Sequence, residues 1–183
     1  MTSLKKICNH WTAGNYKPCQ QDLDSYHYLI DDKGRIYTGT YSPEDNLNCY
    51  DGKYAKHCGG GNTGCIGIAL CAMVGFTESK KQTKCPITQK QFEALCCLNA
   101  YLSVKHGILV TEKNIFTHYE FDSKKRVPEG KIDIVFLSHL PNLSKYSIGN
   151  YLRQKISWYK EKIKQGKYTF TKKGDYYEFL AKV

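Results

Sequence analysis

Hydrophobic and polar positions along the chain predict a mixed arrangement of strands and helices. The segment LKKICNHW predicts a short strand that ends near His10, and the continuously apolar CIGIALCAMVGF predicts a buried central strand. SYHYLID and GRIYTG flank DKG, which predicts a hairpin with Gly34 at its turn. Residues 41–64 are polar and predict a long loop, which in a compact domain usually carries function. KNIFTHYEF predicts a loop into a short strand that carries His118.

Apolar positions at helical spacing predict two helices. The first, ITQKQFEALCCLNAYLSVKHG, begins with a capping box formed by Thr88 and Gln91, and Gly107 ends it. The second is expected over about residues 147–165. KYTFTKKGDYYEFL then predicts a small hairpin. The order of these elements indicates an α/β fold with a mixed central β-sheet flanked by helices.

Composition indicates one folded domain. The chain has 183 residues, of which 41% are hydrophobic and 13% aromatic, enough to form a core. No apolar run approaches about 18 residues, so no membrane span is expected. The first residues lack the apolar core of a secretory signal, so we expect synthesis in the cytoplasm without a signal peptide. Residues 144–183 are expected to pack as a basic helix and hairpin on the domain formed by residues 1–143.

Charge narrows the class of partner. Lys and Arg number 27 against 17 Asp and Glu, a formal net charge of +10. From Lys145 to the end there are ten basic and three acidic residues, a local charge of +7. Such a balance favours polyanions such as nucleic acid, an acidic membrane or a bacterial cell wall. No nucleic-acid-binding motif is recognisable, so nucleic acid is not expected as a partner.

The nine cysteines do not indicate a disulfide framework or a zinc ribbon. The count is odd, Cys96 and Cys97 are adjacent, and no C-x-x-C pair occurs. We expect mostly free, buried thiols in a reducing compartment.

Two histidines and a carboxylate form a candidate metal site. His10 and His118 each stand where an apolar strand is expected to end, and Asp133 follows. Two His and one carboxylate are a common ligand set for catalytic zinc, with a fourth position left for water. Spacing alone is a weak signal, because the chain has six His and each can equally be a surface or core residue.

The stretch PEGKID places Lys131 two residues before Asp133. In an extended chain such residues point to the same side. The two can therefore be a surface ion pair or two parts of one site, and the spacing does not choose between them.

Five short motifs carry a family resemblance. They are NHWTAG, SYHYLIDDKGRIYTG, KHCGGGNTGCIGIAL, THYEF and GKID, in that order. Over about residues 5–137 the chain resembles the zinc-dependent N-acetylmuramoyl-L-alanine amidases of the amidase-2 family. That family includes phage lysozyme-type amidases and is similar in fold to peptidoglycan recognition proteins. No single motif would be specific, but their order is.

The resemblance implies roles for individual residues. It implies that His10, His118 and Asp133 hold Zn²⁺, with Asp133 where phage members can have Cys. It implies that Lys131 stabilises the oxyanion and that Tyr26 holds the attacking water.

Two further residues are implied as substrate contacts. His57 and Asn62 lie in a Gly-rich loop that resembles the substrate-groove loop of the family. We expect substrate contact from His57 and, with less weight, from Asn62. The alternative is that the glycines serve a turn and His57 is exposed to solvent.

Two positions depart from the family pattern. Another branch of the family has a glutamate on the central strand, where this chain has Ala69. The general base is therefore in doubt. A proline often follows the aspartate ligand, whereas Ile134 follows here, so a different loop shape is expected.

The resemblance implies hydrolysis of the amide between N-acetylmuramic acid and L-alanine in peptidoglycan or muropeptides. We expect the protein to be a monomer. We expect a phage-type endolysin that reaches the cell wall after release. A delivered toxin, a cytoplasmic muropeptide-recycling amidase and a non-catalytic peptidoglycan-binding protein remain alternatives. A thiol-dependent amidopeptidase that pairs a cysteine with His57 or His27 is a further one.

Overall fold

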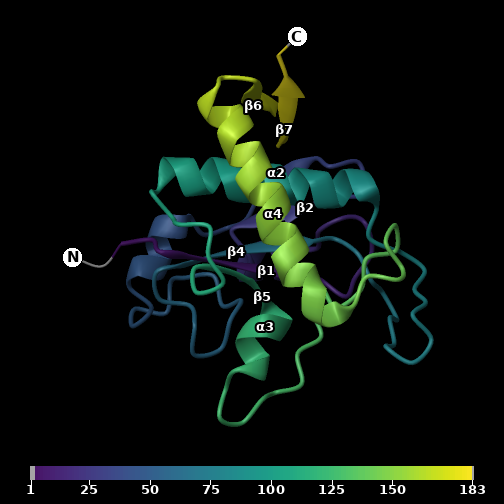
Figure 1. The fold of residues 1–183 in the computed structure, drawn as a ribbon. Coiled ribbons are helices and arrows are strands. Elements are labelled where there is room, and N and C mark those ends of the chain that lie inside the picture. Colours follow the sequence, from purple (N-terminus) through teal and green to yellow (C-terminus); the bar gives the residue numbers. More distant parts are fainter. Residues whose placement is uncertain (1–2, 183) are drawn as a thin grey trace.

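The computed structural model describes residues 3–182 and has the expected α/β architecture, a mixed seven-stranded sheet with helices (Figure 1). In chain order the elements are β1 (Lys6–Trp11), α1 (Gln20–Ser25), β2 (Tyr28–Ile30), β3 (Ile36–Thr38), the 3₁₀ helix η1 (Pro43–Leu47), β4 (Cys65–Leu70), α2 (Gln89–Lys105), β5 (Ile115–Thr117), α3 (His118–Ser123), α4 (Lys145–Lys164), β6 (Tyr168–Lys173) and β7 (Tyr176–Ala181). Within residues 3–182, no helix is both long and apolar enough to span a membrane.

The strand order is β5-β1-β4-β2-β3-β7-β6. The first four strands run parallel to one another, and the β2–β3 hairpin begins the antiparallel part. β1 lies between β4 and β5, so its backbone is paired on both edges. The predicted hairpin is confirmed, with Gly34 at φ 78° in its turn. A side chain at that φ would be strained, which explains the glycine.

The two faces of the sheet have different coverings. On β1, Asn9 points to the helical face, where its side-chain amide donates to Asn99 of α2 at 3.3 Å. Side chains alternate along a strand, so Cys8 and His10 point to the opposite face. Cys8 packs there with Cys58 and other residues of a small second core. The sheet thus separates the main core from the face that carries His10.

Helix α2 forms as its sequence predicts. The Thr88 hydroxyl accepts from the backbone N–H of Gln91 at 3.0 Å, and the Gln91 side chain accepts from the Thr88 N–H at 3.4 Å. Gly107 follows the helix at φ 66°. The Gln91 amide also donates to the carbonyls of Ile30 and Cys71, which fixes α2 to two strands of the sheet.

The C-terminal segment is part of the same sheet and core. Helix α4 crosses α2 and packs on it (Figure 1), and Ile148, Leu152 and Ile156 belong to the main core. The β6–β7 hairpin extends the sheet through one residue pair, Ile36 with Tyr177. The division of the chain at residue 143 stays a prediction.

Helix α1 and the 3₁₀ helix η1 are absent from the sequence expectations. Both are short, and α1 buries none of its residues, so it lacks the apolar stripe on which such predictions depend. Helix α1 ends at Ser25, and Tyr26 is the next residue, at the C-cap of the helix. η1 lies inside the predicted long loop, which is otherwise confirmed.

Candidate metal centre

Strand β1 supplies the first residue of the site. His10 is fully buried and lies directly beside Ala69 in the β1–β4 ladder. The β1–β5 ladder ends at Asn9, so the backbone of His10 is paired with β4 one residue beyond the last pair with β5. The expected position at the end of this strand is confirmed.

His118 enters from the neighbouring strand, although not as a strand residue. β5 ends at Thr117, whose hydroxyl accepts from the N–H of Glu120 at 3.1 Å while the Glu120 carboxylate accepts from the N–H of Thr117 at 3.0 Å. This capping box starts α3 at His118. The sequence predicts that His118 lies in a strand, and this is wrong by one residue. The capping box ends the strand at Thr117.

Asp133 lies in a turn, not in an extended segment. Ile134 has φ 62°, a left-handed conformation that is strained for a β-branched residue. Among residues 3–182 no ion pair joins Lys131 to Asp133, and the Lys131 ammonium instead lies 3.5 Å from the carboxylate of Glu129. A loop shape that differs from the family pattern because of Ile134 stays a prediction.

The three expected ligands converge. The Nδ1 atoms of His10 and His118 are 3.1 Å apart, and Oδ2 of Asp133 lies 3.2 Å from the first and 2.6 Å from the second. A tetrahedral zinc ion with bonds of about 2.0–2.1 Å has ligand atoms about 3.3 Å apart. Two imidazole nitrogens and a carboxylate oxygen that face one another at these distances fit a shared cation.

The electrostatics of His10 and Asp133 favour their ligating forms. Burial lowers the pKa of His10 to about 4, although Asp133 opposes this, so His10 is neutral at pH 7. Burial would raise the pKa of Asp133, but its close contacts with the imidazoles of His10 and His118 outweigh burial and lower that pKa to about 2. A ligating imidazole must be neutral and a ligating carboxylate ionised, and His10 and Asp133 have these forms.

Tyr26 lies beside the ligands. Its ring centroid is 5.1 Å from that of His10. Burial and the charge of Asp133 raise the pKa of the Tyr26 hydroxyl, so it keeps its proton at neutral pH. Tyr26 therefore offers the site a neutral hydroxyl, which both donates and accepts hydrogen bonds.

Lys131 is held near the site by its backbone. Its N–H donates to the Asp122 carboxylate at 2.9 Å, and the N–H of Glu129 donates to the same carboxylate at 3.0 Å. Burial would raise the pKa of Asp122, but these hydrogen bonds lower it to about 2. Asp122 was not singled out in the sequence, where it is only the first residue of a polar insertion. The positive charge of Lys131 is among the groups that lower the pKa of His10.

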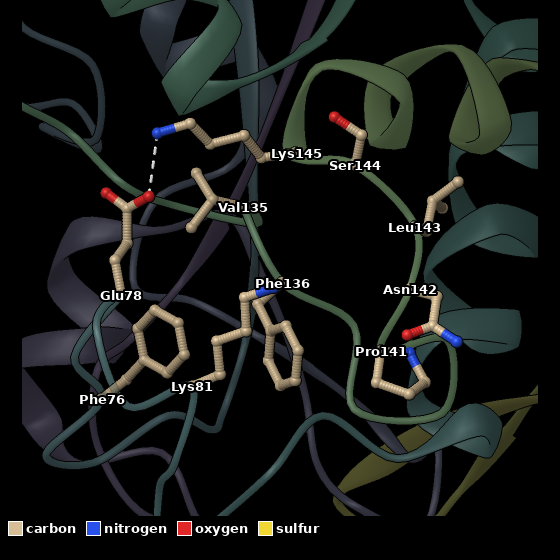
Figure 2. A pocket seen from close by; sticks show the side chains of 10 residues that line it. All are labelled: Phe76, Glu78, Lys81, Val135, Phe136, Pro141, Asn142, Leu143, Ser144 and Lys145. Carbon is tan, nitrogen blue, oxygen red and sulfur yellow. Dashed lines mark hydrogen bonds and ion pairs between the residues drawn. The ribbon is translucent and has the colours of Figure 1, made fainter.

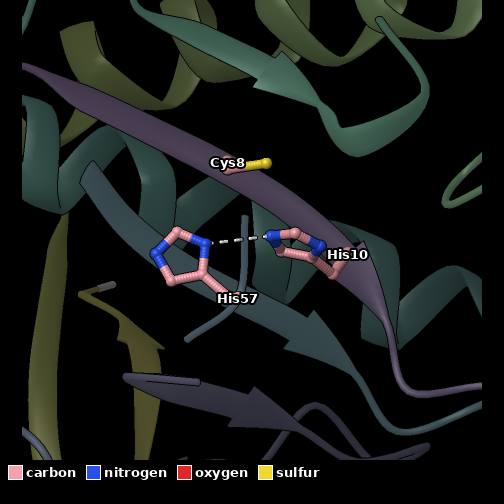
Figure 3. Close-up of side chains that lie close together, drawn as sticks. All are labelled: Cys8, His10 and His57. Carbon is pink, nitrogen blue, oxygen red and sulfur yellow. Dashed lines mark hydrogen bonds between the residues drawn. The ribbon is translucent and has the colours of Figure 1, made fainter. Parts of the chain in front are cut away.

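His57 occupies a different place from the one expected. It is 6% exposed, and its Nδ1 lies 3.2 Å from Nε2 of His10 (Figure 3). The loop folds back over β4, so the ring lies behind His10 and not in an open groove. The alternative of a solvent-exposed side chain is wrong, because the ring is buried, whereas substrate contact by His57 stays a prediction.

Asn62 holds the loop together. Its side-chain oxygen accepts from the N–H of Cys58 at 2.8 Å, and its carbonyl accepts from the Asn46 amide at 3.2 Å. Asn46 is fully buried and also accepts from His27 at 3.0 Å. Substrate contact by Asn62 stays a prediction.

A second group of potential ligands shares His10. The ligand atoms of Cys8, His10 and His57 all lie within 4.8 Å of one another. The facing nitrogens of the two histidines are already joined by a hydrogen bond, so they do not present free lone pairs together. His27 also uses both ring nitrogens, with Asn46 and with the N–H of Gly67. Neither His57 nor His27 has a nitrogen left to activate a thiol, which disfavours the thiol-dependent alternative.

A cavity of about 480 Å³ is lined on one side by Val135 and Phe136, which follow the Asp133 turn in the chain (Figure 2). Its lining residues are Phe76, Glu78, Lys81, Val135, Phe136, Pro141, Asn142, Leu143, Ser144 and Lys145. Phe76 packs on Trp11, the neighbour of His10, with ring centroids 5.1 Å apart, and it stacks on Phe136 at 5.7 Å. Lys145 and Glu78 form an ion pair of 2.8 Å at one end of the cavity, marked by the dashed line in Figure 2.

The fold and the site define a class of α/β protein with a candidate two-histidine, one-carboxylate metal centre on the face of its sheet opposite helix α2. The family model for N-acetylmuramoyl-L-alanine amidase (Amidase_2) matches residues 2–133. The chain belongs to this family. The match covers all three candidate ligands.

Solved structures with similar folds include amidases and recognition proteins. The amidase AmiD from E. coli, in complex with anhydro-N-acetylmuramic acid-L-Ala-D-gamma-Glu-L-Lys, is 21% identical over 68% of this chain, with a TM-score of 0.43. PlyL is 16% identical over 85% of each chain, with a TM-score of 0.48. Drosophila peptidoglycan recognition protein SA is 16% identical over 65% of this chain and 69% of its own, with a TM-score of 0.44.

This chain spans about half of AmiD, 52% of its length. A comparison with curated proteins finds no significant match. Family membership therefore rests on the family model.

Proposed function

We propose that this protein is a zinc-dependent amidase that hydrolyses the bond between N-acetylmuramic acid and L-alanine in peptidoglycan. The observation that carries the proposal is the convergence of His10 Nδ1, His118 Nδ1 and Asp133 Oδ2 within 3.2 Å of one another. Family membership supplies the substrate class. The formal charge of +10 supports an anionic wall polymer as partner. A basic protein is attracted to such a polymer and accumulates near it, and added salt weakens this attraction.

The proposed ligands are the two Nδ1 atoms and the Asp133 carboxylate. When bound, zinc would supply a Lewis acid that lowers the pKa of water toward about 7 and polarises the scissile carbonyl. His10 and His118 contribute neutral donors, and Asp133 contributes one negative charge. Few anionic ligands leave the site with a net positive charge, which favours both effects.

The chain's own residues then divide the remaining work. The hydroxyl of the half-buried Tyr26 is proposed to hydrogen-bond and orient the attacking water. Lys131 is proposed to stabilise the negative oxygen that develops on the lactyl carbonyl, for which a compact ammonium is suited. As the carbon–nitrogen bond breaks, the alanine nitrogen gains a proton that comes ultimately from the attacking water.

The cavity beyond the Asp133 turn is the proposed place for part of the substrate. Its apolar side, formed by Phe76 and Phe136, can pack against the methyl and methylene groups of a stem peptide. Lys81 can pair with a stem carboxylate. The Lys145–Glu78 ion pair lies at the cavity and involves the first residue of α4, so the C-terminal segment forms one of its walls.

The test uses the full chain and purified sacculi. Zinc-loaded protein should release new L-alanine amino termini from the sacculi, and treatment with a chelator should remove this activity until zinc is restored. Binding to sacculi without new amino termini would instead identify a non-catalytic peptidoglycan-binding protein, and the proposal would be wrong.

We also propose action on intact cell wall after release or delivery, as for a phage-type endolysin. Ten basic residues against three acidic ones from Lys145 onward support a polymeric anionic substrate. A comparison of rates on intact sacculi and on soluble anhydro-muropeptides tests this. A strong preference for the soluble substrate would favour a recycling amidase.

A further inference from the structure

A chain of hydrogen bonds runs from His10 into the interior. Nε2 of His10 lies 3.2 Å from Nδ1 of His57, and Nε2 of His57 lies 3.2 Å from the carbonyl oxygen of Cys65. Figure 3 shows the two rings side by side above the strands, with this contact as a dashed line. The chain therefore connects a candidate metal ligand to a backbone group that cannot change its protonation.

The carbonyl at the end of the chain determines where each proton lies. A carbonyl oxygen only accepts, so Nε2 of His57 must carry the hydrogen. The ring of His57 is 6% exposed, and its two nitrogens face His10 and the Cys65 carbonyl and no carboxylate, so the ring is neutral and its Nδ1 is an acceptor. Nε2 of His10 is then the donor to His57. A ligating imidazole is neutral, so Nδ1 of His10 is left with a free lone pair that faces His118 and Asp133.

The ring of His57 is fixed in this position by packing. It meets the His10 ring edge-on, with centroids 5.3 Å apart and planes at 78°. A Cβ atom at residue 67 would lie 2.5 Å from Cγ of His57, so the glycine there makes room for the ring. Gly67 also donates its N–H to His27 at 2.8 Å. The loop that carries His57 thus packs against β4 through a residue without a side chain.

We propose that His57 is a positioning residue that fixes the tautomer and orientation of His10, so that Nδ1 of His10 faces the metal without a proton. This inference rests on the proposed function. His57 is not one of the three proposed ligands and is almost fully buried. It acts on the metal through its hydrogen bond with His10. Such partners of metal ligands typically change metal affinity by about 10–100-fold when removed.

The first test reads the tautomer directly in the metal-free wild-type protein. Nitrogen NMR of the full chain, labelled with ¹⁵N-histidine, should show His10 and His57 both protonated at Nε2 and not at Nδ1. A proton on Nδ1 of His10 would overturn the proposal. The measurement needs no variant and no bound metal, so it stands even if a variant fails to fold or the protein binds no zinc.

The second test measures zinc affinity by competition with a chromophoric chelator. His57→Phe should weaken zinc binding by about 10–100-fold. Gly67→Ala should weaken it too, because the added methyl group displaces the His57 ring. His57→Gln should restore most of the affinity, because an amide can accept from His10 and donate to the carbonyl of Cys65. Leu95→Ala is the control, because it makes a cavity in the main core on the opposite face of the sheet.

The outcomes separate this proposal from the proposed function. Equal affinity of wild type and His57→Phe would overturn the role of His57, as would equal losses in His57→Phe, His57→Gln and Leu95→Ala. Zinc binding that depends on His57, without cleavage of sacculi, would leave that role intact and refute the amidase. Cleavage by a His57→Phe protein with unchanged zinc affinity would refute the role of His57 and leave the proposed amidase intact.

Discussion

Ala69 is the direct partner of His10 in the β1–β4 ladder, so its methyl group is the nearest neighbour of the first ligand on the central strand. A glutamate on this strand, as in another branch of the family, would place a carboxylate at the centre. Ala69 places none there, and the ring of Tyr26, which carries a neutral hydroxyl, lies 5.1 Å from that of His10. We therefore propose Tyr26 as the residue that orients the attacking water.

Tyr26→Phe should retain zinc and lower turnover. Loss of one oriented hydrogen bond in a catalytic site typically reduces kcat by about 10²–10³-fold. Single-turnover cleavage of sacculi and a zinc titration check both parts. Tyr16→Phe is a matched control, because the hydroxyl of Tyr16 bonds to the carbonyl of Pro86, away from the ligands. Unchanged turnover in Tyr26→Phe would remove the proposed role of the hydroxyl.

Lys131→Ala should lower turnover by about 100-fold or more while zinc stays bound, because the positive charge near the developing oxyanion is lost. The control is Lys124→Ala in the same basic loop, since Lys124 pairs with Glu112 on the surface. Zinc content and rate are measured on the same preparations. Loss of metal without a rate defect after reloading would show that Lys131 acts on the site's structure and not on the reaction.

Asp133→Asn should abolish zinc binding, whereas Asp133→Cys should retain it. A thiolate, like a carboxylate, supplies one negative charge and one zinc-binding atom, and a neutral amide does not. His118→Ala should also remove the metal. Metal content after dialysis checks each variant. Stoichiometric zinc and full activity in His118→Ala would contradict the assigned centre.

Ile134→Pro should destabilise the protein and weaken zinc binding, although proline is common after this ligand in the family. Proline fixes φ near −65°, whereas residue 134 has φ 62°. The substitution must therefore reshape the turn that carries Asp133. Ile134→Leu, which keeps the side chain apolar and the backbone unrestricted, serves as control. Chemical denaturation and zinc titration give the result, and wild-type values for Ile134→Pro would contradict the turn geometry.

The metal-free protein should lose folding stability between pH 7 and mild acid because of His27. Burial lowers its folded-state pKa to about 4, while the unfolded value is about 6.5. As pH falls below about 6.5, the unfolded chain takes up a proton that the folded protein refuses, so stability is lost between about pH 6.5 and 4. From pH 7 to 5 this single group contributes a loss of about 2 kcal/mol.

Urea unfolding at pH 7 and 5 measures that loss. His27→Gln can keep the hydrogen bonds to Asn46 and Gly67 but has no proton to take up, so its stability should fall less than that of wild type. His106→Gln is the control, because His106 is only half-buried and should change the pH dependence less. An identical pH dependence in wild type and His27→Gln would contradict the prediction.

The sequence predicts the strands, the two long helices and the position of His10, because periodicity and capping residues are local signals, but it does not predict the short helix that begins at His118. It does not predict the placement of His57, which depends on a loop folding back over β4 onto Gly67. The turn at Asp133 was also missed, since a left-handed isoleucine has no sequence signature.

The position of β1 has a consequence for folding. The first strand of the chain pairs with β4 and β5, which end at Leu70 and Thr117, and the third proposed ligand comes later still. Contacts this distant in sequence form slowly, because long loops must close first. A nascent chain cannot bring the three ligands together until Asp133 has been synthesised. Zinc binding should therefore occur only in the completed fold and stabilise it by mass action, which makes metal uptake a marker of successful folding.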